Sequence, residues 1–164
     1  MSLENTLRDL APGLLRYCGG RIGCPFLAEE IAQESLRILV ERWQKSGPPE
    51  NAAAFLFAVA RRRAARLAAR RRLLSPLDPL LERPSQEPAP DAVILLKERF
   101  GKAQQALGRL SRQDREVLLL FAAAELDLAS IAEVLGLSLS AVKMRLHRAR
   151  RRLLEQMEVI HELA

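Results

Sequence analysis

Residues 127–152 constrain the fold of this chain more than any other segment, because they read as two helices joined by a tight turn. Ile131 and Leu135 recur at the spacing of one helical face, and Gly136 follows where a tight turn disfavours a Cβ atom. Ser138 stands where a hydroxyl can cap the free amides of the next helix. This pattern predicts a helix-turn-helix.

The second helix of this pair has two different faces. At about 100° per residue, the apolar face consists of Val142, Leu146, Ala149 and Leu153. The opposite face consists of Met144, His147, Arg148 and Arg151, flanked by Lys143 and Arg152. A single basic face favours insertion into a DNA groove, and an ordinary amphipathic helix with arginines in water is the alternative.

Positive charge is concentrated in two stretches of the chain. Residues 61–72 contain seven arginines and residues 143–152 contain six basic side chains, which is half of the 26 Lys and Arg residues. This clustering and the net charge of +6 favour a polyanionic partner, because general solubility does not require grouped cations. An anionic membrane surface is the alternative, but the apolar faces lack the Trp and Phe belt of an interfacial anchor.

Composition and prolines indicate the organisation of the chain. Ala, Leu and Arg dominate and only 4% of residues are aromatic, which predicts an all-α protein. Five of the nine prolines lie between Pro76 and Pro90, so we predict two small helical domains, 1–74 and 92–164, joined by a Pro-rich flexible linker at 75–91. The expected helices are Leu3–Cys18, Phe26–Gln44, Ala52–Leu74 and 92–107, with another opening at Ser111.

Several classes of protein are disfavoured by the sequence. There is no apolar run of about 18 residues and no N-terminal signal, so we expect a cytoplasmic chain with no direct membrane insertion. Cys18 and Cys24 have no partners at metal-ligand spacing and are predicted to be reduced core thiols, with a redox role as the alternative. We expect no catalytic residues, no metal and no cofactor, because no acidic cluster or activated nucleophile stands out.

Three segments of the sequence resemble the minimal two-domain sigma factors of bacterial RNA polymerase, the extracytoplasmic-function (ECF) type. They are LAEEIAQESL (27–36), AFLFAVARRRAARLAARRR (54–72) and LSRQDREVLLLFAAAELDLASIAEVLGLSLSAVKMRLHRARRRL (110–153). The resemblance implies a region 2-like domain before the prolines and a region 4-like domain after them. It also implies a protein that binds core RNA polymerase and promoter DNA and directs the start of transcription.

The resemblance assigns three sets of contact residues. An acidic motif would dock on a coiled coil of the polymerase clamp through Glu30, Ile31, Gln33 and Glu34. A loop and the helix after it would capture the melted minus-10 strand through Asn51, Phe55, Phe57, Arg61, Arg62, Arg63 and Arg66. The helix-turn-helix would read the minus-35 bases through Lys143, Met144, His147 and Arg148, with Arg115, Ser140 and Arg145 on phosphates.

Three positions depart from the family pattern. Phe55 stands where Trp is common in the family. A role as a core residue explains it at least as well as a role in opening the DNA strands. Arg62 replaces a common Asn and is suited to a phosphate rather than a base. Glu125 stands where glycine is usual, so we expect the joint before the helix-turn-helix to be more helical.

Two other functions compete with this interpretation. A stand-alone helix-turn-helix transcriptional regulator explains the basic helix, but it leaves the motif from Glu30 to Glu34 without a role. A small recombinase or nuclease lacks candidate catalytic residues. The apolar and basic faces of two loosely tethered modules also lead us to expect an inhibitory anti-sigma factor as a partner.

Overall fold

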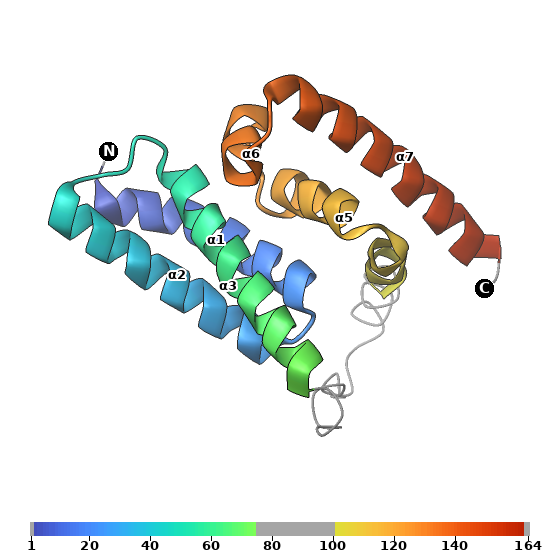
Figure 1. Ribbon diagram of the computed structural model, residues 1–164, viewed down its shortest axis with the longest axis horizontal. Coiled ribbons are helices and arrows are strands. Elements are labelled where there is room, and N and C mark those ends of the chain that lie inside the picture. The colour runs from blue at the N-terminus through green and yellow to red at the C-terminus, as the bar shows by residue number, and fades with distance from the viewer. Residues whose placement is uncertain (1, 75–100, 163–164) are drawn as a thin grey trace.

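The computed structural model describes residues 2–74 and 101–162, and the predicted linker at 75–91 lies outside these ranges. The two ranges hold helices and no strand, which confirms the all-α class. The elements, shown in Figure 1, are α1 (Leu3–Ile22), α2 (Pro25–Ser46), α3 (Ala52–Leu74), helical residues 101–109, α5 (Arg112–Leu118), the π-helical turn η2 (Leu119–Ala123), α6 (Leu128–Leu135) and α7 (Leu139–Glu162). No helix within the described ranges is both long and apolar enough to cross a membrane.

Helices α1, α2 and α3 pack together around one apolar centre. Its largest fully buried side chains are Leu14, Tyr17, Leu39, Leu56 and Phe57. The rings of Tyr17 and Phe57 meet edge to face, with centroids 5.6 Å apart and an interplanar angle of 79°. This geometry is favourable for aromatic pairs, and it fixes α3 against α1.

The first helix is longer than the sequence predicts. We expected a break near residues 19–25, but α1 continues through Gly19 and Gly20 to Ile22. It ends at Gly23, whose φ of 75° is left-handed and whose amide donates to the carbonyl of Gly19. The paired glycines therefore lie inside the helix, and only the third glycine supplies the backbone conformation that stops it.

The predicted helix-turn-helix is confirmed at its caps. Asp127 accepts from the Ser130 amide at the start of α6, and Gly136 ends that helix with a left-handed φ of 64°. The Ser138 hydroxyl then accepts from the Ala141 amide at 3.1 Å and caps α7. Side-chain caps of this kind stabilise a helix by about 1 kcal/mol each, so the turn is fixed by local chemistry.

The joint before the helix-turn-helix is less helical than expected, so that prediction was wrong. Helix α5 widens into η2, and the chain then leaves helical geometry over residues 125–127. Glu125 has a φ of 58°, a conformation that normally favours glycine. The carboxylate of Glu125 lies 3.1 Å from Arg16 of α1, a contact that glycine would lack.

The two groups of helices touch each other, whereas the sequence suggested loosely tethered modules. Figure 1 shows α1–α3 on one side and α5–α7 on the other, and α1 contacts η2 while α3 contacts α6. Arg16 of α1 donates to the carbonyl of Ala123 at 2.9 Å across this boundary. We call this boundary, where α1 and α3 meet α5, η2 and α6, the seam.

Cys18 and Cys24 should differ sharply in reactivity. Cys18 is fully buried, and burial raises its pKa to about 12, so at pH 8 only about one thiol in 10,000 is ionised. Cys24 is half-buried at the start of α2. We expect iodoacetamide to alkylate Cys24 and to spare Cys18 until urea is added, as measured by peptide mass spectrometry. Equal labelling of the two thiols in the native chain would contradict this placement.

Candidate nucleic-acid interface

The basic face predicted for α7 is exposed. Lys143, Met144, His147 and Arg148 all lie on the surface, and Met144 is 63% exposed. Within the described ranges Lys143 and Arg148 make no ion pair, so both remain available to an anionic ligand. The opposite face packs as predicted, with Val142, Leu146 and Ala149 in the core.

Other cations of the second group support the fold. The guanidinium of Arg150 lies 4.4 Å from the centre of the Phe121 ring, and Arg152 pairs with the buried Asp114. Arg115, predicted to contact phosphate, donates to the carbonyls of Leu107 at 2.9 Å and Gly108 at 3.1 Å. Its guanidinium therefore caps the helix at 101–109 in this conformation.

The other two residues predicted to contact phosphate, Ser140 and Arg145, differ in exposure. Ser140 is exposed in the first turn of α7. Arg145 is half-buried and lines a cavity of about 300 Å³ at the seam together with Arg61 and Arg112. Glu116 lines the same cavity, so its carboxylate offsets part of the positive charge of these three guanidinium groups.

A second cavity, of about 310 Å³, lies beside the loop between α2 and α3. The lining residues are Pro49, Glu50, Asn51, Ala54, Phe55, Ala58, Arg62 and Glu133. Asn51 accepts from the Ala54 amide at 2.9 Å and so caps α3, while its amide nitrogen donates to Ser130 at 3.0 Å and to Glu133 at 3.1 Å. The cavity therefore combines an amide, an aromatic ring and a cation, the groups that recognise single-stranded bases.

The two phenylalanines of α3 lie in different environments. Phe55 lines the cavity and is half-buried. Phe57 is fully buried against Tyr17, so no face of its ring is open to a base. The structure thus brings Phe55 to the predicted strand-capturing site and places Phe57 in the core.

Some arginines of α3 are exposed to solvent, and others form ion pairs with acidic residues of the same chain. Arg62 and Arg66 are exposed. Arg63 donates to Glu34 of α2 at 3.0 Å, and Arg61 lies 3.9 Å from Glu116. Only part of the arginine run is therefore open to DNA in this conformation.

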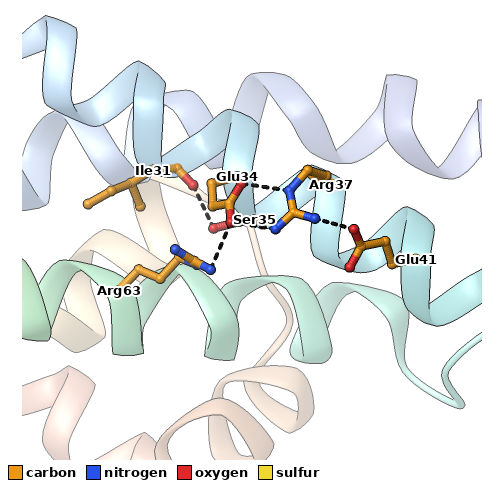
Figure 2. Close-up of polar contacts among 6 residues, drawn as sticks. All are labelled: Ile31, Glu34, Ser35, Arg37, Glu41 and Arg63. Carbon is orange, nitrogen blue, oxygen red and sulfur yellow. Dashed lines mark hydrogen bonds and ion pairs between the residues drawn. The ribbon is translucent and has the colours of Figure 1, made fainter.

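The acidic motif of α2 forms a charged network on the surface, shown in Figure 2. Glu34 accepts from Arg37 and from Arg63, and Arg37 also pairs with Glu41. Hydrogen bonds from Arg37 lower the pKa of Glu34, so its carboxylate is charged at neutral pH. The surface thus presents a fixed negative group with a defined orientation.

The other residues of the motif lie on two sides of α2. Glu30 and Gln33 are exposed, and the Gln33 amide donates to Glu29 at 3.1 Å. Ile31 is only 9% exposed and belongs to the core. Glu30, Gln33 and Glu34 are therefore accessible to a partner, while Ile31 fixes the helix that carries them.

Sequence reasoning missed a buried polar cluster at the seam. Glu116 of α5 accepts from the Tyr17 hydroxyl and lies 2.8 Å from the Arg21 guanidinium of α1. Burial and the negative charge of Glu116 raise the pKa of Tyr17 well above its ordinary value. Because Tyr17 and Glu116 are 99 positions apart in the chain, no periodic pattern in the sequence marks their contact. The only sequence feature that suggests burial of Glu116 is the apolar residue after it, Val117.

Comparisons with known proteins agree with this geometry. Residues 100–153 match the family model described as sigma-70, region 4. The chain is 32% identical over 163 residues to the ECF RNA polymerase sigma factor ShbA of Streptomyces griseus, covering 92% of this chain and 84% of that protein. It is 27% identical over 164 residues to the ECF RNA polymerase sigma factor SigD of Mycobacterium tuberculosis, covering 94% and 76%.

Solved structures share the fold. The sigma factor RpoE of Bartonella quintana, crystallised with the anti-sigma factor NepR, aligns with a TM-score of 0.70 at 23% identity, over 95% of this chain and 96% of that one. CnrH, in complex with the cytosolic domain of CnrY, aligns with a TM-score of 0.69 at 21% identity, over 96% and 88%.

Proposed function

The chain belongs to the ECF sigma factors of RNA polymerase. From this premise we propose which surface of the chain binds each partner at the start of transcription. One surface binds the core enzyme, one reads duplex DNA and one holds the melted strand. The exposed basic face of α7 on a capped helix-turn-helix is the observation that carries the proposal. The role is recognition in the cytoplasm, and the polymerase performs the chemistry.

Helix α7 reads the minus-35 element in the major groove. Arg148 offers two parallel donors that match the acceptors of guanine, and Met144 offers an apolar surface to a thymine methyl group. Lys143 reaches a guanine or a phosphate, and His147 lies between these residues on the same exposed face. Ser140 and Arg145 contact phosphates and fix the register of the helix.

The cavity beside the loop receives a base of the melted minus-10 strand. Asn51 hydrogen-bonds to the base edge, Phe55 provides a stacking surface, and Arg62 neutralises the backbone. Exposed Arg66 continues this positive track along α3, Arg61 joins it once Glu116 is displaced, and Arg63 adds its charge while it stays paired with Glu34. Capture of an unpaired base offsets the cost of unstacking, which is a few kcal/mol.

The acidic surface of α2 docks on the polymerase clamp. Glu34 supplies a charge held in place by two arginines, and Gln33 and Glu30 supply further polar contacts. A basic helical surface of the clamp complements this pattern and guides association.

Replacing Arg148 with Ala should relax sequence discrimination at one minus-35 position by about 1 to 3 kcal/mol, because a bidentate contact to one base is lost. Replacing Arg145 with Ala is the matched comparison, since a phosphate contact should weaken binding to all sequences by a similar factor. Both variants are measured in complex with core polymerase on a library of promoter sequences. An unchanged base preference for Arg148→Ala would contradict the assignment.

In vitro transcription with core polymerase on the same library tests the function as a whole. We expect start sites that depend on the chain and share two DNA motifs. A stand-alone regulator would instead bind duplex DNA tightly without polymerase, so binding by the purified chain alone distinguishes the two functions. Failure to associate with core polymerase would overturn the proposal.

We also propose that an anti-sigma factor restrains this protein. The structural relative RpoE was solved with the anti-sigma factor NepR, and CnrH was solved with the cytosolic domain of CnrY. In the described ranges the chain leaves Phe26 75%, Met144 63% and Leu154 62% exposed, which gives an apolar partner several contact points. Affinity capture of the tagged chain from its own cells should recover polymerase and a second protein, and recovery of polymerase alone would argue against the inhibitor.

A further inference from the structure

The carboxylate of Glu34 is bound by arginines from two different helices. Arg37, on the same helix as Glu34, donates to the two carboxylate oxygens at 2.7 and 2.6 Å. Arg63 of α3 donates to Glu34 Oε1 at 3.0 Å, and Figure 2 shows this side chain reaching from α3 toward α2. Oε1 of Glu34 therefore accepts hydrogen bonds from both helices at once.

Arg37 by itself does not fix the position of Glu34. The Arg37 side chain is 54% exposed, and it also pairs with Glu41 one turn further along α2. Exposed ion pairs within one helix hold long side chains in place only weakly. With Arg37 as its sole partner, the carboxylate of Glu34 would move together with a mobile guanidinium.

Arg63 is held more firmly, because its stem leaves α3 at the edge of the packed face. Ala60, three residues earlier, and Ala64, the next residue, are both buried. The Arg63 side chain itself is only 33% exposed, and α3 packs directly on α2. Its guanidinium therefore reaches Glu34 from a fixed helix.

The charges of this network cancel. Glu34 and Glu41 supply two negative groups, and Arg37 and Arg63 supply two positive groups. Arg63 thus places a cation beside a surface that we propose for a basic partner, which lowers the attraction between the two. Any benefit of Arg63 to that interface must be geometric rather than electrostatic.

We propose that Arg63 is a positioning residue of the polymerase-binding surface, which holds the Glu34 carboxylate in the orientation that meets the clamp. The inference rests on the proposed function, because it takes the acidic surface of α2 as the docking site. Arg63 acts through Glu34, and its donor stays on that carboxylate instead of a DNA phosphate. It differs in this from exposed Arg66 of the same arginine run.

The expected size of the effect follows from side-chain ordering. A carboxylate that is already oriented loses less conformational freedom when the polymerase binds. The cost of ordering one mobile side chain at an interface weakens binding by about three- to tenfold. Among variants of one interface such differences appear chiefly in the dissociation rate.

Arg63→Met separates geometry from charge, because the two predict changes of opposite sign. The variant keeps an unbranched stem and removes the donors and the positive charge. Electrostatic attraction alone then predicts tighter binding to a basic clamp, whereas loss of position predicts weaker binding. Arg63→Lys keeps the charge but replaces the planar fork of donors with one ammonium group.

Arg70→Met is the matched control. Arg70 is an exposed residue of the same helix, and it belongs to no surface that we assign to a partner. The variant therefore makes the same change of charge without touching Glu34.

The rates of binding to core polymerase test the proposal. Core polymerase is immobilised on a biosensor without DNA, and the association and dissociation rates of each variant of the whole chain are measured. Arg63→Met is repeated in a Glu34→Ala background, which completes a double-mutant cycle. Urea unfolding followed by Trp43 fluorescence shows whether each variant keeps the stability of the wild type.

We expect Arg63→Met to dissociate about three- to tenfold faster than the wild type, Arg63→Lys to lie between them, and Arg70→Met to match the wild type. In the Glu34→Ala background, Arg63→Met should cause no further loss, because no carboxylate is left to position. Binding by Arg63→Met as tight as that of the wild type, or an equal loss in the Glu34→Ala background, would overturn the positioning role alone. If Glu34→Ala itself bound like the wild type, the proposed docking surface would be wrong and this inference with it.

Discussion

Replacing Phe57 with Ala should lower the free energy of unfolding by about 3 to 5 kcal/mol. The Phe57 ring is fully buried and packs edge to face on Tyr17, so its removal leaves a cavity between α1 and α3. The single tryptophan, Trp43 of α2, packs against the same core and reports unfolding by fluorescence in a urea titration.

Phe55→Ala is the matched control for this prediction. Phe55 is on the same helix but only half-buried, and it lines the loop cavity. We expect it to lose less stability than Phe57→Ala and to reduce capture of the melted strand by the holoenzyme. Equal stability losses, or a Phe57→Ala chain that is as stable as the wild type, would mean that the two rings have been assigned to the wrong environments.

The sequence could not separate these two phenylalanines, because the helix around them is apolar on most sides. Ala54, Leu56, Phe57, Val59 and Ala60 are all buried, so periodicity does not mark one inward face. The helix-turn-helix was predictable because two of its signals are local, the turn at Gly136 and the cap at Ser138, and the structure adds a third local signal, a cap at Asp127.

The seam depends on contacts that local signals do not encode. Gly13 and Gly20 look like weak points of a helix, yet a Cβ atom on either would meet residue 124 or Leu119 of the other group. Likewise, the arginines of residues 61–72 predict a site for polyanions but not which of them are paired within the chain. Arg61 and Arg63 have acidic partners far along the chain, and only the tertiary structure brings these together.

Reversing the charge of Glu34 with Lys should weaken binding to core polymerase by about 100-fold, which corresponds to roughly 2.7 kcal/mol. In the wild-type chain Arg37 and Arg63 hold the carboxylate of Glu34 on the surface of α2. A lysine there repels both arginines and also meets the basic clamp surface that we propose as its partner, and juxtaposed like charges cost several kcal/mol. Fluorescence anisotropy of the labelled chain titrated with core polymerase measures the loss.

Glu4→Lys distinguishes a local contact from a general effect of charge. Glu4 is an exposed residue of α1 that pairs with Arg8, so this variant makes the same charge change and also breaks an arginine pair. Because exposed ion pairs contribute about 0 to 1 kcal/mol, neither variant should unfold the chain. If the two variants weakened polymerase binding equally, net charge would explain the loss and Glu34 would have no specific contact. A selective loss with Glu34→Lys would instead place the polymerase on the acidic face of α2.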